Sequence, residues 1–136
     1  MRSLCLAVLL FSPALLHTAT AAVLPAAVAD AFDSYTQLPG ILVPQLQKVQ
    51  DTPSADAAAE PLKNTLTQVY EVREKLHKMP RLTPAQNQQV RLQYESRMRK
   101  EWARMYAEIS RLQNARCYQS ARFAEVFRLM CMMIEK

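Results

Sequence analysis

The chain has 136 residues, a formal net charge of +5 and 50% hydrophobic residues, which suits one small globular domain rather than a disordered or multidomain protein. Its only glycine is Gly40, so a glycine-rich phosphate-binding loop is excluded. Its only histidines are His17 and His77, and the sequence shows neither a catalytic triad nor a paired-histidine metal site. We therefore expect a protein that is not an enzyme and needs no cofactor.

The start of the chain has the three parts of a secretory signal peptide. Arg2 supplies a positive charge, residues 4–16 form an apolar run, and residues 19–21 are small, as signal peptidase requires. A membrane-spanning helix is the alternative, but it needs roughly 20 apolar residues. We expect residues 1–21 to be removed, leaving 22–136 as a single helical domain. This domain would be periplasmic or secreted, without stable membrane insertion.

Charge is distributed unevenly along the part that remains. Residues 22–60 carry one lysine and five carboxylates, whereas residues 61–136 carry 15 basic and seven acidic side chains. An acidic front segment can therefore fold onto a basic back segment. Because export separates the protein from chromosomes and cellular RNA, we expect no nucleic acid partner. A basic surface would instead face a protein partner or an anionic envelope polymer.

Apolar residues recur at helical spacing in the first segment after the signal. They are Val28, Phe32, Tyr35, Leu38, Leu42, Leu46 and Val49. Pro39, Gly40 and Pro44 interrupt this pattern, and a proline inside a helix costs about 3 kcal/mol or more. We therefore predict an N-terminal kinked helix, with a first piece over residues 25–38 and a second over 42–50.

A second helix is predicted over residues 55–79. Ser54 is its candidate N-cap, and the residues that follow are rich in alanine, a strong helix former. Its apolar stripe consists of Leu62, Leu66, Val69, Val72, Leu76 and Met79. The helix should stop at Met79, because the residue before Pro80 is pushed out of helical geometry.

The longest helix is predicted over residues 84–116. Thr83 suits its N-cap, Pro84 its first position, and Gln86 can complete a capping box. Its apolar stripe consists of Val90, Tyr94, Met98, Trp102, Met105, Ile109 and Leu112. Since a short link separates this helix from the preceding one, we predict an antiparallel helical hairpin in which the two stripes face each other.

A short C-terminal helix is predicted over residues 121–135, after a break at 116–120. Ser120 can cap it, and one uninterrupted helix of about fifty residues is the less favoured alternative for a domain of this size. Its apolar face consists of Phe123, Val126, Phe127, Met130 and Ile134. The predicted fold class is all-α, with the hairpin of residues 55–79 and 84–116 packed against the N-terminal kinked helix and this short helix.

Two cysteines, Cys117 and Cys131, follow the signal peptide, and export would permit a disulfide. If residues 117–131 were helical, the two Cα atoms would lie about 21 Å apart, against the roughly 7 Å that a disulfide can span. We therefore rank buried free thiols first, a bridge between two chains second, and an intrachain bridge third.

Methionines near the C-terminus could act as soft ligands for Cu(I). On a helix, however, Met130, Met132 and Met133 point in different directions, so we interpret them as core-filling residues and predict no metal site. His77 is interpreted as a surface residue near a helix C-terminus, where the helix dipole favours it.

The strongest binding candidate in the sequence is a cluster of basic residues on the longest predicted helix. Arg97, Lys100, Arg104 and Arg111 lie within about 60° of one another on a helical wheel, and we call them the basic ridge. The ridge would bind an acidic partner or an anionic polymer. The alternative is a solvated face that neighbouring glutamates partly neutralise.

Residues 82–86, Leu-Thr-Pro-Ala-Gln, resemble the Leu-Thr-x-x-Gln signature of the LTxxQ family of periplasmic helical proteins, which includes Spy-like chaperones and metal-stress sensors. The resemblance implies a small, exported, all-helical dimer that cradles unfolded proteins without ATP. The wider pattern is also similar to small exported helical proteins of unknown function. It includes the proline-bounded link at 80–84 and the Cys-Tyr-Gln-Ser segment at 117–120.

Taken as a whole, the sequence predicts an exported envelope interaction or scaffold module without catalytic activity, which could form a homodimer. The alternative is an ATP-independent, Spy-like periplasmic chaperone or stress protein.

Overall fold

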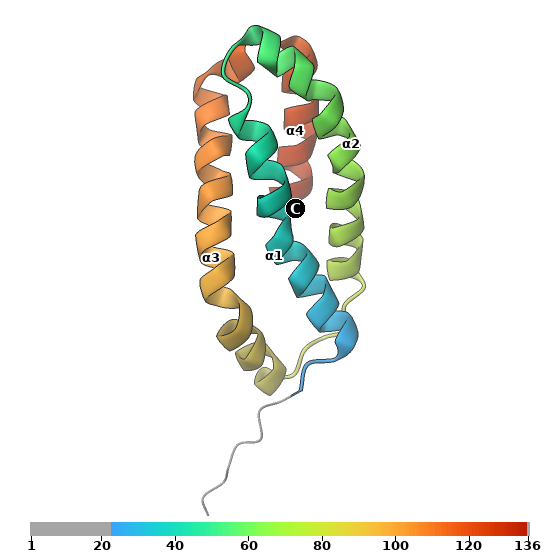
Figure 1. Ribbon diagram of the computed structural model, residues 1–136. Helices are drawn as coiled ribbons and strands as arrows, with labels where there is room; N and C mark the ends of the chain where they lie inside the picture. Colours follow the sequence, from blue (N-terminus) through green and yellow to red (C-terminus); the bar gives the residue numbers. More distant parts are fainter. Residues whose placement is uncertain (1–22, 136) are drawn as a thin grey trace, which may run out of the picture.

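The computed structural model describes residues 23–135, so the predicted signal peptide lies outside the described residues. Within this range, α1 spans Ala26–Gln47, α2 Thr52–His77, α3 Pro84–Asn114, the short turn η1 Arg116–Gln119, and α4 Ala121–Glu135. Consecutive α-helices run in opposite directions (Figure 1). The predicted all-α fold class is confirmed.

The helices surround one hydrophobic core, to which each of them contributes. α1 packs against both α2 and α3, and α4 packs against α2 behind α1 (Figure 1). The most deeply buried large side chains are Leu42, Leu46, Leu62, Met105, Leu112, Phe123 and Met130. Trp102, at the centre of the predicted stripe on α3, is only 6% exposed.

The prediction that the stripes of α2 and α3 face each other is wrong. α1 lies between these two helices, which make little direct contact within the described residues (Figure 1). The link over residues 78–83 can span up to about 20 Å at roughly 3.3 Å per residue, which is enough to reach the diagonal position of a bundle. Each stripe therefore faces α1 and the shared core.

The predicted division of the first helix into two pieces is also wrong, because α1 is one helix that contains both Pro39 and Pro44. Tertiary packing outweighs local preference here. Leu38, Leu42 and Leu46 are buried, and burial of each leucine contributes about 1.5–3 kcal/mol. With Val28 and Val43 of α1, which are also buried, the five side chains contribute about 7.5–15 kcal/mol, against about 6 kcal/mol for the two interior prolines.

Capping boxes begin both α2 and α3. Gln86 and Thr83 cap α3 as predicted, since the Thr83 Oγ1 accepts from the Gln86 backbone N–H at 3.2 Å and the Gln86 side chain accepts from the Thr83 N–H at 2.9 Å. α2 begins earlier than predicted. Its N-cap is Asp51, whose carboxylate accepts from the Ser54 N–H at 2.8 Å, so Ser54 occupies the third helical position rather than the cap.

The predicted break between α3 and α4 is confirmed, and its geometry is unusual. Four consecutive non-glycine residues adopt left-handed backbone angles, with φ between 47° and 62°: Arg116, Cys117, Tyr118 and Gln119. Each costs roughly 1–2 kcal/mol relative to a right-handed conformation. The Thr52 hydroxyl donates to the Tyr118 carbonyl at 2.7 Å, which ties η1 to the start of α2. Ser120 then caps α4 by accepting from the Phe123 N–H at 3.1 Å.

Candidate functional site

The candidate site exists because the helices differ in length. α4 has 15 residues and α3 has 31, or about 22 Å and 46 Å at 1.5 Å per residue. α4 starts at η1 and ends about halfway along the bundle (Figure 1). Beyond its end, α1, α2 and α3 surround a position that a full-length fourth helix would occupy.

Two adjoining cavities lie in this position, and Tyr35 and Trp102 line both of them. The first has a volume of about 360 Å³ and lies between α1 and α3, where it is also lined by Phe32, Val90, Arg91, Glu95, Met98, Arg99 and Tyr106. The second has a volume of about 310 Å³ and is also lined by Leu38, Val69, Arg73, Leu76, His77, Met133 and Ile134. We call the two cavities together the aromatic groove. Such volumes and apolar linings are typical of binding sites.

A row of three aromatic rings forms the centre of the aromatic groove. The Trp102 ring stacks on Tyr35 with 4.6 Å between centroids, and the Tyr106 ring is tilted against Trp102 with 5.8 Å between centroids. Tyr106 is 49% exposed, so the row reaches from the core to the solvent. Because these side chains have few rotatable bonds, they present apolar area to a partner at low entropic cost.

The groove also contains polar groups that remain neutral. Burial, and then the neighbouring Tyr106, raise the pKa of the Tyr35 phenol, so Tyr35 stays protonated at neutral pH. The Trp102 Nε1 is buried and has no hydrogen-bond partner among residues 23–135. A buried donor without a partner costs about 1–3 kcal/mol.

The rim of the aromatic groove is basic. Arg73 on α2 and Arg91 and Arg99 on α3 line its edges, and the Arg99 guanidinium pairs with the Glu95 carboxylate at 2.6 Å. Within the described part of the chain, Arg73 and Arg91 form no ion pair, and Arg73 donates only to the His77 ring at 3.4 Å. The edges of the groove therefore carry excess positive charge.

The basic ridge predicted from the sequence lies outside the aromatic groove, since none of its four residues lines either cavity. Arg97 and Lys100 are exposed. Arg104 is also exposed and pairs with Glu101 at 3.3 Å. Two of the four ridge residues, Arg104 and Arg111, therefore form ion pairs within α3, and Arg111 makes further contacts outside this helix.

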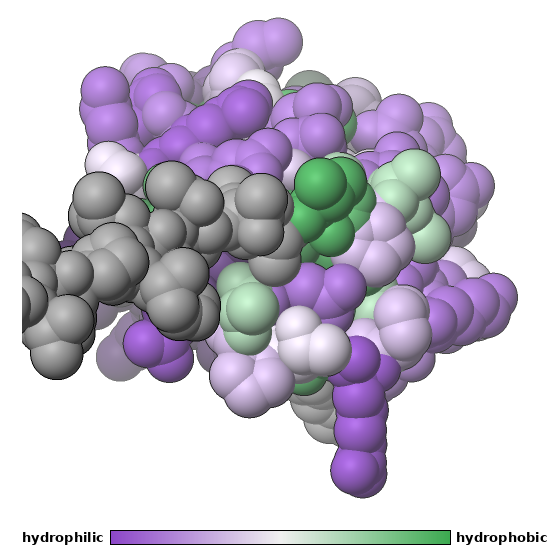
Figure 2. All heavy atoms as spheres, turned by 90° about the horizontal axis from the view of Figure 1, so that it is seen from below, coloured by the Kyte–Doolittle hydropathy of each residue, from purple (hydrophilic) through white to green (hydrophobic). Residues whose placement is uncertain are grey.

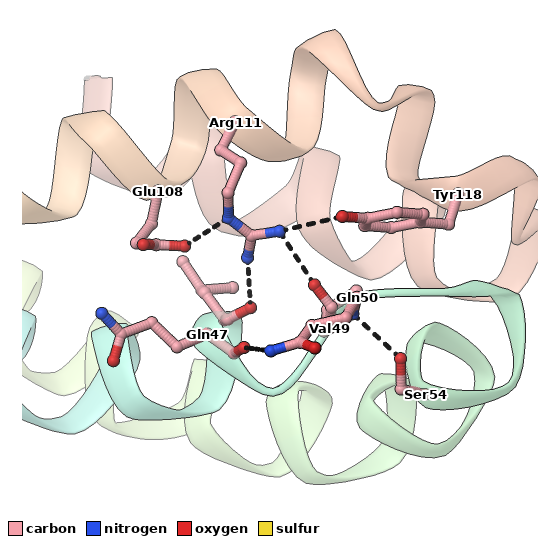
Figure 3. A network of polar contacts seen from close by, with 8 residues as sticks. Gln47, Val49, Gln50, Ser54, Glu108, Arg111 and Tyr118 are labelled. Atoms are coloured by element: carbon pink, nitrogen blue, oxygen red, sulfur yellow. Dashed lines mark hydrogen bonds and ion pairs between the residues drawn. The ribbon is translucent and has the colours of Figure 1, made fainter.

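Arg111 joins the end of α3 to the end of α1 (Figure 3). Its guanidinium donates to the backbone carbonyls of Leu46 at 2.8 Å and Val49 at 2.9 Å, and to the Tyr118 hydroxyl at 3.2 Å. Glu108 accepts from its Nε at 2.8 Å. With its donors used in this way, Arg111 is a structural cap on α1 rather than a residue that faces a partner.

Cys117 and Cys131 are both buried free thiols, the first of the three arrangements considered from the sequence. Burial raises the pKa of Cys117. Burial, then Glu135 and Cys117, raise the pKa of Cys131 to about 11. Since the thiolate is the reactive form, both side chains are unreactive core residues at neutral pH.

The C-terminal methionines diverge as predicted, because Met130 is buried and Met132 is exposed. Among residues 23–135, no group of three or more histidine, cysteine, aspartate or glutamate side chains could hold a metal ion. His77 is exposed at the end of α2, as predicted, although it also lines the aromatic groove.

The aromatic groove was not predicted from the sequence, although two signals for it are present. Tyr106 follows Trp102 by one helical turn, which widens the apolar stripe of α3 on one side. The short predicted C-terminal helix could not cover the whole of a helix twice as long. The sequence does not show that these two features lie on the same side of the bundle.

The end of the molecule at which α1 begins is mainly hydrophilic, with scattered hydrophobic side chains (Figure 2). Each helix in residues 23–135 falls short of the length or apolarity needed to cross a membrane.

No protein-family model, curated protein or solved structure matches the chain.

Proposed function

We propose that this protein is an exported, non-catalytic interaction module of the cell envelope, and that it binds a protein partner in the aromatic groove. One observation carries the proposal. The rings of Tyr35, Trp102 and Tyr106 line cavities that lie where the fourth helix of the bundle would be, and no described segment fills these cavities. Apolar grooves between helices are a common way of binding an amphipathic segment of another protein.

The composition of the aromatic groove supports a protein partner. Tryptophan, tyrosine, methionine and arginine are enriched in protein interfaces, and Met98, Tyr106 and Arg91 bring three of these types to the groove beside Trp102. Val90 and Leu76 are only partly buried, so a partner would remove more apolar area from water. Each Å² of apolar surface that is buried contributes about 25 cal/mol.

Site-specific cross-linking in cells tests the proposal. A photo-reactive amino acid replaces Tyr106 in one variant and Tyr70 in another. Tyr70 is the matched control, since it is an exposed tyrosine on α2 that does not line the groove. We expect position 106 to cross-link to a discrete protein partner and position 70 to give no such product. The same products from both positions, or none from either, would contradict the proposal.

A chaperone-like role is the second candidate, because an open apolar groove with a basic rim would also hold segments of unfolded proteins. The segment 82–86 that resembles the LTxxQ signature forms the capping box of α3, outside the groove. Near-stoichiometric suppression of the aggregation of an unfolding client, reduced by Tyr106→Glu but not by Tyr70→Glu, would support this role. No suppression at equimolar protein would remove it.

A further inference from the structure

We propose that the occupant of the aromatic groove is an acidic amphipathic helix of about 15 residues on the partner protein, and that this helix completes the bundle by continuing the line of α4. This inference rests on the proposed function and specifies the chemistry of the partner.

The length of the proposed helix follows from the bundle. α3 exceeds α4 by about 24 Å, since the two helices have 31 and 15 residues at 1.5 Å per residue. A helix of about 15 residues fills that distance. Met133 and Ile134, at the end of α4, line the adjoining end of the groove, so an incoming helix would meet an apolar end surface there.

The apolar side chains that line the groove favour a bound helix with an apolar face. Tyr35 on α1, Leu76 on α2 and Met98 on α3 line the groove and are only partly buried, so the bundle leaves apolar area there that an occupant would cover. A helix that packs on two or three others needs apolar residues at steps of three and four, as α1, α2 and α3 themselves have.

The positive charges on the α2 and α3 sides of the groove favour a bound helix with acidic flanks. Arg73 lies on the α2 wall, Arg91 and Arg99 lie on the α3 wall, and Glu95 offsets only one of these three charges. A helix bound between the walls has one flank toward each. Carboxylates on both flanks would pair with Arg73 and Arg91, which form no ion pairs within the described residues.

Binding of three synthetic peptides to the purified protein tests the inference. The first is a 15-residue amphipathic helix with a leucine stripe and glutamate flanks, the second replaces each glutamate with lysine, and the third scrambles the first. Trp102 is the only tryptophan in the chain, so its fluorescence reports binding at the groove. We expect the glutamate peptide to bind at least tenfold more tightly than the other two. Its affinity should fall at least fivefold between 50 and 500 mM salt.

Two charge-reversal variants locate the interaction. Arg73→Glu with Arg91→Glu changes the groove rim, whereas Arg97→Glu with Lys100→Glu makes the same change in net charge on exposed residues outside the groove. We expect the rim variant to bind the glutamate peptide at least tenfold more weakly and to gain affinity for the lysine peptide. The ridge variant should bind both peptides within twofold of the unmodified protein.

The outcomes separate this inference from the proposed function. Equal binding of the glutamate and lysine peptides would overturn the acidic helix but leave an apolar protein site in place. Equal losses in the rim and ridge variants would also overturn the inference, since they would indicate attraction by net charge alone. Binding of none of the peptides, together with binding of dodecanoate in the groove, would overturn both, because it would indicate a small amphiphile as the ligand.

Discussion

Single side chains join segments that are far apart in this sequence, and Arg111 does so most extensively. Its guanidinium bonds two carbonyls near the end of α1, the Tyr118 ring hydroxyl and the Glu108 carboxylate. On a helical wheel the same residue belongs to an exposed basic ridge. The wheel shows only the direction of a side chain on its own helix, so it could not reveal that the end of α1 lies within reach.

The first prediction concerns this cap. Arg111→Ala should destabilise the protein by about 2 kcal/mol, because charge-assisted hydrogen bonds to backbone carbonyls are lost and those carbonyls remain partly buried. Arg104→Ala is the matched control, since Arg104 also pairs with a glutamate three residues earlier on α3 but bonds no other element. It should change stability by less than about 0.5 kcal/mol. Chemical denaturation measures both, and equal effects would show that Arg111 contributes only a surface ion pair.

The second prediction concerns the pH dependence of the α2 cap. Hydrogen bonds from the Ser54 side chain and backbone lower the pKa of Asp51 below its usual range. The capping contribution is therefore present above the ordinary carboxylate pKa, near 4, and is lost as pH falls through the lowered folded value. Asp51→Ala should lower the thermal midpoint at pH 7, and the difference from the unmodified protein should shrink below pH 4.

Asp51→Asn is the control for this measurement, because asparagine keeps the capping oxygen without a titrating proton. Its thermal midpoint at pH 7 should lie closer to that of the unmodified protein than the alanine variant does. A difference between Asp51→Ala and the unmodified protein that stays constant from pH 7 to pH 2 would contradict the assignment.

At the scale of elements, local signals predicted the helix ends better than the helix contacts. The caps Thr83 and Ser120 act within three residues of themselves, so the sequence alone identifies them. The kink expected at Pro39 does not divide α1, because burial of neighbouring apolar side chains outweighs the local cost of proline. Which helices are neighbours depends on the path of the link at 78–83, which no local pattern encodes.

The third prediction concerns the turn between α3 and α4. Gln119 is exposed and has a φ of 62°, a conformation that glycine adopts without steric cost. Gln119→Gly should therefore stabilise the protein by about 1 kcal/mol. Gln88→Gly is the matched control, since Gln88 is an exposed glutamine within right-handed α3, and it should destabilise by about 0.5–1 kcal/mol. Destabilisation by both substitutions would show that η1 is not left-handed in solution.

At the scale of the whole molecule, the unequal lengths of the helices determine both the stable half and the candidate site. Where α4 is present, the core is closed around side chains such as Phe123 and Met130, which have no solvent exposure. Beyond the end of α4, Val90, Met98 and Leu76 are only partly buried. The sequence contains both helix lengths, but the groove follows from them only when the order of the helices around the core is known.

The same geometry permits a direct test that does not require the partner. The chain is extended after residue 136 by 15 residues that continue α4 as a helix, with leucines on the face toward the groove and glutamates on its flanks. The control extension has the same residues in scrambled order. Thermal unfolding and the fluorescence of Trp102 are then compared among the three proteins.

If the aromatic groove is the vacant fourth-helix position, the patterned extension raises the thermal midpoint by several degrees and shifts the Trp102 emission to shorter wavelength. It also prevents binding of the glutamate peptide. The scrambled extension does none of these. Equal midpoints and spectra for the patterned and scrambled extensions would contradict the account, because a helix placed in line with α4 would then find no site to fill.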